Sequence, residues 1–362
     1  MHIKTYKIDG TFNGKECFVH GRACAINEEN LVMTMQKLNV AGSDDFSSLY
    51  VLKSCDGGKT WSTPQEESAF KIAANENGIR TVGCDAAHIF HKKTGTPIVI
   101  GHTASYAPNA VEPLKNTRRA TFYTTYDIKS ENYKPMKFID VPEDACPGGF
   151  GSGSSQFIEE ENGDLLIPGY AQEQGISKSA VIRCSFDGEF IKFKSISNFL
   201  SVDFGRGICE ASICRFGGKY YLTLRNDDYG FWSVSDDGKT FSEQELWKWD
   251  TGDILPTYNT QSHWLLCGGK LYLVYTRKAG NNDHVFRHRA PLFMAEVDTE
   301  RMCILRHTEI IVVPERGARL GNFGITQISD NKAIITACEW MQPAGCEKFG
   351  SDNSTFVTLV EC

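Results

Sequence analysis

Polar side chains recur at two fixed places in a sequence pattern that is repeated along the chain. In each copy a polar residue precedes a short apolar run, a turn of Gly, Asn or Asp follows, and a second apolar run ends on another polar residue, as in 210–225 and 261–277. The polar residues of the six copies are Arg22 and Gln36; Asp85, His88 and His102; Gln156 and Tyr170; Glu210 and Arg225; Gln261, His263 and Arg277; Asn322 and Glu339. Arginine, carboxylate and imidazole groups are costly to bury together unless a ligand or mutual pairing satisfies them. The pattern therefore predicts a binding site for a polar, anionic small molecule.

The apolar runs between these residues predict β-strands, and no segment has the periodicity of a long amphipathic helix. They are short, rich in β-branched or aromatic residues and bounded by Gly, Asn or Asp, at Leu31–Met35, Leu49–Lys53, Pro97–Gly101, Leu165–Pro168, Tyr220–Leu224, Lys270–Tyr275 and Lys332–Ala337. Six hairpins that start near residues 22, 88, 156, 210, 261 and 322 predict an all-β fold, a six-bladed β-propeller of four-stranded antiparallel blades. In such a blade the start of the first strand and the end of the second lie on the same face, so the polar residues converge at the axis.

Residues 54–61, with the sequence SCDGGKTW, have the composition of a tight turn that leads into a strand. Ser54 and Asp56 can accept hydrogen bonds from turn N–H groups, the two glycines allow a positive φ, and Trp61 can pack against the sheet. Shorter copies start at residues 185 and 235. The 131 residues between the starts at 54 and 185 are about three units of 44, and one propeller blade takes roughly 40–50 residues. The repeat therefore favours a propeller.

The pattern S-x-D-x-G-x-T-W is the Asp box, and the chain resembles the sialidase (neuraminidase) superfamily of six-bladed BNR-repeat propellers over nearly its whole length. That family has an arginine on the first blade followed by an acid/base aspartate, which Arg22 and Asp45 match. It has a glutamate that opens the fourth blade, an arginine one hairpin later and a third arginine on the next blade, which Glu210, Arg225 and Arg277 match. The resemblance implies that the three arginines hold a substrate carboxylate. It also implies that Asp45 protonates the leaving oxygen, while Glu210 activates or acts as the nucleophile.

The chain departs from the family at the nucleophile. Sialidases place a nucleophilic tyrosine on the last blade, paired with the glutamate, but no tyrosine follows Tyr275. Tyr170 and Tyr258 are substitutes from other blades, and Glu339 is a carboxylate nucleophile or base on the last one. For the acid, Asp44 is an equal rival of Asp45.

A second departure is the segment 281–293, which is foreign to the sialidase pattern. It holds Asp283, His284, Arg287, His288 and Arg289 within seven residues. A rim loop that contacts substrate and a subunit contact both fit this composition.

We expect an exo-acting glycoside hydrolase of sialidase type for an acidic sugar such as a sialoside. One alternative is a uronate lyase, in which His102 or His88 acts with Tyr170 to remove the proton α to a carboxylate that an arginine neutralises. Another is a non-catalytic propeller that binds glycans. The candidate residues are Asp45, Glu210, Glu339, His102 and Tyr170 for catalysis, and Arg22, Arg225, Arg277, Asp85, His88, Gln156 and His263 for substrate binding.

Structural roles compete with these assignments. The arginines can form salt bridges between neighbouring blades, Glu210 can neutralise Arg225, and the histidines can bond backbone within the channel. A metal on Asp85, His88 and His102 is not expected because their spacing matches no recognised ligand pattern.

Composition limits the classes of partner. The chain has 362 residues, a net charge of −7 and no basic run, so nucleic acid is not an expected partner. No apolar stretch approaches membrane-spanning length, and we expect no membrane association. The 13 cysteines lack paired spacings and the start has no signal-like apolar core, which favours a reducing cytoplasm with most cysteines buried. We expect one propeller domain over 1–362, an acidic oligosaccharide or glycoside as substrate and no cofactor; a homo-oligomer is left open.

Overall fold

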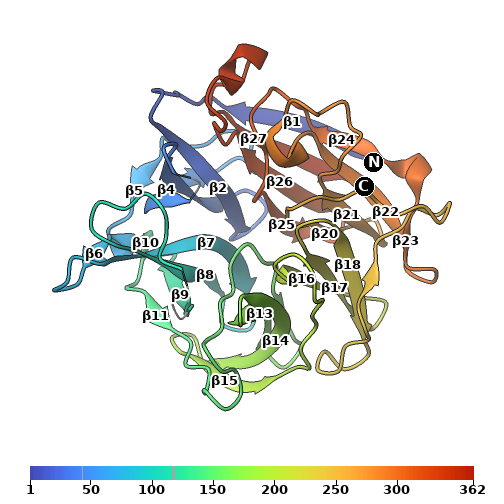
Figure 1. Ribbon diagram of the computed structural model, residues 1–362, viewed down its shortest axis with the longest axis horizontal. Helices are drawn as coiled ribbons and strands as arrows, with labels where there is room; N and C mark the ends of the chain where they lie inside the picture. Colours follow the sequence, from blue (N-terminus) through green and yellow to red (C-terminus); the bar gives the residue numbers. More distant parts are fainter. Residues whose placement is uncertain (43, 116–118) are drawn as a thin grey trace.

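Six antiparallel β-sheets surround a central axis in the computed structural model, which describes residues 1–42, 44–115 and 119–362 (Figure 1). Each sheet is one blade, and its first strand lies nearest the axis. Blade 1 consists of β2 (Glu16–Ala25), β3 (Leu31–Asn39), β4 (Asp45–Ser54) and β5 (Gln65–Glu66). Blade 2 consists of β7 (Arg80–His91), β8 (Thr96–Tyr106), β9 (Thr121–Asp127) and β10 (Asn132–Tyr133), and β6 (Ala73–Ala74) pairs with β7 and β11 (Lys137–Phe138) with β9. Blade 3 consists of β12 (Ile158–Glu159), β13 (Asp164–Glu173), β14 (Ile176–Phe186) and β15 (Ile191–Ile196).

Blades 4 to 6 follow the same order. Blade 4 consists of β16 (Cys209–Phe216), β17 (Lys219–Arg225), β18 (Gly230–Ser235) and β19 (Glu245–Leu246). Blade 5 consists of β20 (His263–Cys267), β21 (Lys270–Tyr275), β22 (Leu292–Asp298) and β23 (Cys303–Ile304), and β24 (Ile310–Val313) also pairs with β22. Blade 6 consists of β25 (Gly324–Ser329), β26 (Lys332–Cys338), β27 (Thr355–Glu361) and β1 (His2–Ile8). The short 3₁₀ turns are η1 (Ser68–Phe70), η2 (Phe286–His288), η3 (Arg306–Thr308) and η4 (Cys346–Phe349).

The predicted fold class is confirmed, and so are the six hairpins. Each predicted strand lies within an observed one, in β3, β4, β8, β13, β17, β21 and β26. The starts of the first strands and the ends of the second strands share one face of the propeller. We call this the site face.

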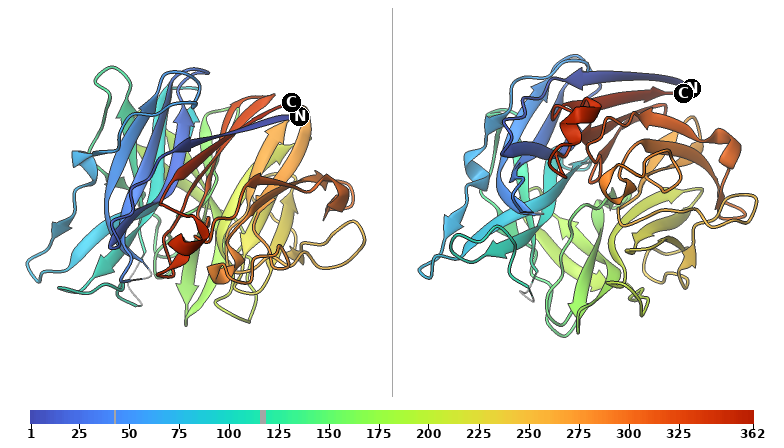
Figure 2. Two further views of the ribbon diagram at one scale, coloured as in Figure 1. Left: turned by 90° about the horizontal axis from the view of Figure 1, so that it is seen from above. Right: turned by 45° about the horizontal axis from the view of Figure 1, so that its top comes forward.

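The ring is closed by the two ends of the chain. Strand β1 is the outermost strand of blade 6 and pairs with β27 along its whole length, from His2 opposite Glu361 to Ile8 opposite Thr355. The termini consequently lie side by side (Figures 1 and 2). Because blade 6 needs both ends of the chain, the inner strands are fixed around the axis only when the ring is complete.

Apolar side chains fill the space between adjacent blades. Ile98 and Ile100 of blade 2 pack with Leu165 and Ile167 of blade 3, and all four are fully buried. Burying each such side chain contributes roughly 1.5–3 kcal/mol. Similar clusters join the other neighbouring blades, so the fold presents the axial strand ends on a rigid frame.

Residues 54–61 form the predicted turn between β4 and β5. Ser54 Oγ and the Asp56 carboxylate accept hydrogen bonds from the N–H groups of residues 58, 59 and 60, at 2.9–3.0 Å. Trp61 Nε1 donates to the carbonyl of Gly58 at 2.9 Å. Gly57 N donates to the carbonyl of Glu29 in the β2–β3 turn, which places this turn on the face opposite the site face. Asp56 therefore shapes a turn.

Cys267 and Cys362 form a disulfide that joins the β20–β21 turn to the end of β27. Of the other eleven cysteines, Cys55 is exposed and the rest are buried, as expected for most of them. Among the described residues, no helix has the length and apolar character needed to cross a membrane.

Candidate functional site

Each blade places one residue in the left-handed backbone region where its chain reaches the axis. These residues are His20 (φ 56°), Asp85 (φ 54°), Ser154 (φ 53°), Glu210 (φ 46°), Asn259 (φ 47°) and Asn322 (φ 64°). This conformation costs a non-glycine residue about 1–2 kcal/mol. In blades 1, 2 and 4 it coincides with a shift of strand register, the mark of a β-bulge that redirects a side chain. The six left-handed residues bring polar side chains together in a ring that we call the axial ring.

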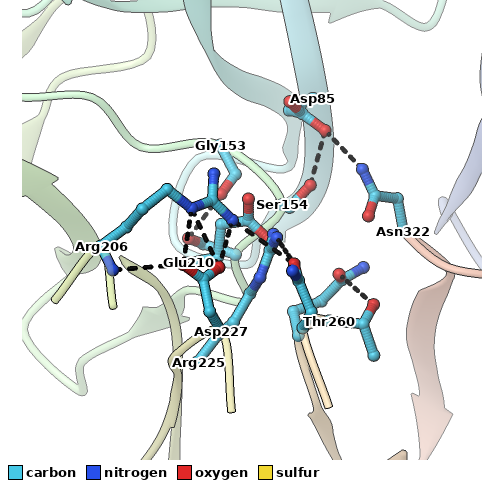
Figure 3. A network of polar contacts seen from close by, with 12 residues as sticks. Asp85, Gly153, Ser154, Arg206, Glu210, Arg225, Asp227, Thr260 and Asn322 are labelled. Atoms are coloured by element: carbon cyan, nitrogen blue, oxygen red, sulfur yellow. Dashed lines mark hydrogen bonds and ion pairs between the residues drawn. The ribbon is translucent and has the colours of Figure 1, made fainter. Parts of the chain in front are cut away.

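Asp85 is the hub of one half of the axial ring. Its Oδ1 accepts hydrogen bonds from Ser154 Oγ at 2.6 Å and from Asn322 Nδ2 at 3.1 Å (Figure 3), and His20 Nδ1 lies 3.5 Å away. Burial alone would raise the pKa of Asp85, but His20, His102 and Arg22 hold it well below its usual range. Asp85 is therefore an ionised carboxylate that orients its neighbours.

Arg22 lies beneath the axial ring and is 2% exposed. Its guanidinium donates to the carbonyls of Ala86 (3.0 Å), Asn322 (3.2 Å) and Phe323 (3.3 Å) and to Ser154 Oγ (2.8 Å). These contacts join blade 1 to blades 2, 3 and 6. Because all of them are internal, the geometry gives Arg22 the inter-blade role that the sequence left open beside carboxylate binding.

The predicted polar residues divide into two layers, one on each side of Arg22. His88, Gln156 and His263 line an axial cavity of about 790 Å³ that extends toward the face opposite the site face. His88 Nε2 lies 3.0 Å from the hydroxyl of Tyr133, His263 Nδ1 lies 2.8 Å from a serine hydroxyl, and the Gln156 amide bonds the backbone of residue 264. Burial lowers the pKa of both His88 and His263 to about 3. The structure thus separates these three residues from the layer on the site face.

His102, Tyr170 and Arg119 meet on the site face beside Asp85. His102 Nε2 lies 3.2 Å from Asp85 Oδ2 and 3.1 Å from Arg119 Nη1. The His102 and Tyr170 rings are 6.1 Å apart between centroids, and the Arg119 guanidinium carbon lies 5.3 Å from the Tyr170 ring centroid. Burial lowers the pKa of His102 and raises that of Tyr170, and Arg119 opposes the second effect. At neutral pH the group therefore holds a neutral imidazole oriented by a carboxylate, a phenol and a cation.

Glu210 and the buried Arg225 form an ion pair at the axial ring (Figure 3). Burial lowers the pKa of Arg225, but Glu210 outweighs it and the net pKa is raised. Arg225 Nη2 also donates to Asn259 Oδ1 at 2.7 Å, and Arg289 Nε donates to the Asn259 carbonyl at 3.0 Å. Asn259 thus holds two guanidinium groups next to each other.

Arg289 is 3% exposed, and among the described residues no carboxylate oxygen lies within 4.0 Å of its guanidinium. Burial, together with Arg225, Arg319 and Arg287, holds its pKa well below the usual range. Its side chain crosses Gly321, where an added Cβ would lie 2.6 Å from Arg289 Cδ. A cation held in this setting favours the binding of an anion.

Three predicted site residues lie in other networks. Arg277 donates to Glu309 Oε1 at 2.7 Å and to Oε2 at 2.6 Å. Asp45 forms an ion pair with Arg80. Glu339 is buried and accepts from the N–H groups of residues 352 and 354 at 2.9 and 3.1 Å, and burial raises its pKa to about 7.

The foreign segment reaches the centre of the site. It carries Arg287, in a left-handed conformation with φ 57°, and Arg289, and both interact electrostatically with Arg225. The segment's charge was visible in the sequence. No sequence signal pointed to Arg119 or Arg319, which lie in loops outside the hairpin pattern.

A metal would find few suitable ligands. Ligand atoms of Cys84, Asp85 and His102 lie within 4.8 Å of one another. Arg22 and Arg119 carry positive charge beside this group, which opposes a bound cation, and Asp85 already accepts two hydrogen bonds.

Comparison with known proteins gives a fold assignment. No family model and no curated sequence matches the chain. It is similar in structure to a protein of unknown function from Dyadobacter fermentans, with TM-score 0.69, 16% identity and coverage of 99% of each chain. It is also similar to the Hadza microbial sialidase Hz136 (TM-score 0.65, 14% identity, 95% of this chain and 66% of that one). The Trypanosoma rangeli sialidase in complex with sialic acid gives TM-score 0.64 and 15% identity, over 99% of this chain and 59% of that one.

The chain therefore spans about three fifths to two thirds of the length of these two sialidases. At 14–16% sequence identity the structural similarity shows the fold of this chain and no more. The protein is a six-bladed propeller with the sialidase fold.

Proposed function

We propose that this protein is a glycosidase of sialidase type that acts on a carboxylate-bearing sugar bound on the site face. The observation that carries the proposal is the pair Arg225 and Arg289, held together by Asn259 and buried, with no carboxylate beside Arg289 among the described residues. Two adjacent guanidinium groups match the two oxygens of a carboxylate, and desolvation strengthens such charge-assisted hydrogen bonds.

For hydrolysis we assign the roles by position. Arg225 and Arg289 bind the carboxylate of the reacting sugar. Tyr170 is the nucleophile, since the Arg119 guanidinium carbon lies 5.3 Å from its ring centroid and the charges of Arg119 and Glu210 both act on its hydroxyl. Glu210 takes its proton, and Arg119 stabilises the phenolate that forms. Asp44 replaces Asp45 as the acid because it interacts electrostatically with Arg287 and Arg319 of the site, whereas Asp45 is paired with Arg80.

Uronate β-elimination is the second candidate, favoured by the contact between His102 and Asp85 and by the nearby Tyr170 and Arg119. In this reaction Arg119 neutralises the uronate carboxylate, His102 or Tyr170 removes the α-proton, and the other group protonates the leaving oxygen. The carbon–oxygen bond breaks as the sugar double bond forms. Both candidate reactions use Tyr170 and Arg119, but they differ in product.

The product identifies the reaction. The protein is incubated with sialosides and with uronate oligosaccharides, and near-ultraviolet absorbance and new reducing ends are both followed. New reducing ends without a chromophore, together with a sugar adduct on Tyr170 trapped by a fluorinated substrate and located by mass spectrometry, are expected for hydrolysis. An unsaturated uronate assigns β-elimination instead. If neither class of acidic sugar binds or reacts, the proposed function is wrong.

A further inference from the structure

The site face carries more positive charge than one carboxylate needs. Among the described residues the arginines of the site outnumber its carboxylates, although the chain as a whole has a net charge of −7. The arginines are Arg22, Arg119, Arg206, Arg225, Arg287, Arg289 and Arg319, and the carboxylates are Asp44, Asp85, Glu210 and Asp227. Arg206 is paired with Asp227 and Arg225 with Glu210 (Figure 3). The excess positive charge therefore lies on the other arginines of this list.

Arg287 and Arg319 form a separate part of this excess positive charge, and both lie close to one aromatic ring. The guanidinium carbons of both lie 5.1 Å from the centroid of Phe286, which is 43% exposed. Arg319 also lies 3.7 Å from the ring centroid of Trp340. We call Arg287, Arg319 and Phe286 the outer arginine site.

The buried guanidinium of Arg319 is incompletely satisfied. The residue is 2% exposed and its Nη2 donates to Gln342 Oε1, whereas its buried Nε has no hydrogen-bond partner among residues 1–42, 44–115 and 119–362. Within the described part of the chain, no carboxylate oxygen lies within 4.0 Å of either Arg287 or Arg319. Asp44 acts on both through its charge at longer range. Burial and the repulsion of Arg287 lower the pKa of Arg319 to about 9.

Two anionic groups of a ligand would neutralise this excess of positive charge, one at each pair of arginines. A carboxylate between Arg225 and Arg289 would be held by donors that Asn259 has already positioned. The outer arginine site lies beyond them on the η2 and 314–323 segments, and its aromatic ring offers an apolar surface for a sugar face. An anionic group there would meet two guanidinium groups for which the described part of the chain supplies no paired carboxylate.

We propose that the outer arginine site binds a second anionic group of the substrate, so that the natural ligand is at least dianionic. The inference rests on the proposed function, because it assumes that Arg225 and Arg289 hold the first carboxylate. The second group is a sulfate ester on the acidic sugar or the carboxylate of a neighbouring acidic sugar. These ligands share their chemistry at the site and differ in the distance between the two charges.

Titration calorimetry at fixed ionic strength tests the proposal with three probes: a monomeric uronic acid, the same sugar with one sulfate ester, and a diuronate. Wild-type protein is expected to bind one of the dianions roughly 10- to 100-fold more tightly than the monoanion. Arg319→Gln is expected to remove this gain and to change the affinity for the monoanion less than about threefold. Arg287→Gln, on a half-buried loop residue, gives the same test if Arg319→Gln does not fold. Arg215→Gln is the matched control, since Arg215 lies on the opposite face and is paired with Glu161; it should keep the whole gain.

The outcomes separate this inference from the proposed function. A wild-type protein that binds the monoanion as tightly as both dianions overturns the second anionic site and leaves the acidic-sugar site standing. Retention of the dianion gain in both arginine variants also overturns it. If none of the three probes binds, the inference fails; if N-acetylneuraminic acid does not bind either, the proposed function fails with it. Tighter binding of the sulfated sugar alone, or of the diuronate alone, supports the inference and identifies the source of the second charge.

Discussion

Replacing Arg289 by methionine should abolish recognition of the substrate carboxylate while leaving the fold intact. Within the described residues the side chain donates only to the Asn259 carbonyl, and its aliphatic part lies against Gly321, a space that methionine can fill. Each charge-assisted hydrogen bond contributes about 1.5–3 kcal/mol, so two lost bonds to a carboxylate correspond to roughly 3–6 kcal/mol, or about 10²- to 10⁴-fold in Kd.

Stability should change little in this variant. Methionine removes a buried charge that is repelled by Arg225, Arg287 and Arg319, which favours the folded state. It also leaves one carbonyl without a donor, at a cost of about 1–3 kcal/mol. Because these effects oppose each other, urea denaturation should give a free energy of unfolding near that of wild type.

Arg277→Met is the matched control, because the sequence placed Arg277 in the carboxylate triad and the structure pairs it with Glu309. We expect Arg277→Met to weaken folding by about 1–3 kcal/mol and to keep the Kd for acidic sugars within about threefold. Calorimetry with a uronic acid and with N-acetylneuraminic acid measures both variants. Normal binding by Arg289→Met together with lost binding by Arg277→Met would refute the reasoning and restore the triad that the sequence predicts.

The remaining predictions concern proton transfer, the axial arginine, acid stability and the turn at 54–61. His102→Gln should lower kcat by about 10²- to 10⁴-fold with little change in ligand affinity if β-elimination operates, and much less if hydrolysis does; steady-state kinetics distinguish the two. Arg22→Lys should destabilise the protein by about 3–5 kcal/mol in urea titrations, because lysine cannot replace four buried hydrogen bonds; unchanged stability with a raised KM would instead mean substrate binding. The pKa of His88 falls from 6.5 to about 3 on folding, so the unfolded state binds more protons between these values and stability should decrease as the pH falls through this range. His88→Gln should reduce that slope by about 1.4 kcal/mol per pH unit, measured by urea titration at several pH values, and an unchanged slope contradicts the assignment. Asp56→Ala should cost about 1–3 kcal/mol of stability without affecting ligand binding, since the carboxylate only accepts turn hydrogen bonds.

Blade number and hairpin positions were predictable because they depend on local chemistry. Turn residues such as those at 54–61 and short apolar strands act over a few neighbouring positions, and the same sequence pattern is repeated in every blade. The repeated sequence pattern also located five residues that the structure brings to the site face: Glu210, Arg225, Asp85, His102 and Tyr170.

The composition of the site was less predictable because three features depend on contacts between blades. Each bulge inserts one extra residue into the first strand of its blade, so the side chains beyond it point to the other face than in a regular strand. In blade 1 the bulge places Arg22 beneath the axial ring and brings His20 into it, whereas the left-handed Ser154 reaches the ring from the loop before β12. The loop that carries Arg287 and Arg289 has no regular pattern, so only its charge could be noted in advance.

The sequence by itself determined the propeller and the positions of its hairpins, because strand alternation and turn chemistry are local properties of the chain. Tertiary structure decided how each arginine is paired. Arg22, Arg277 and Arg289 have the same charge, but one joins blades through carbonyl groups, one is neutralised by Glu309, and one is buried without a carboxylate partner among the described residues. Desolvation and pairing set what a charged group can bind, and both are fixed only when the six blades close around the axis.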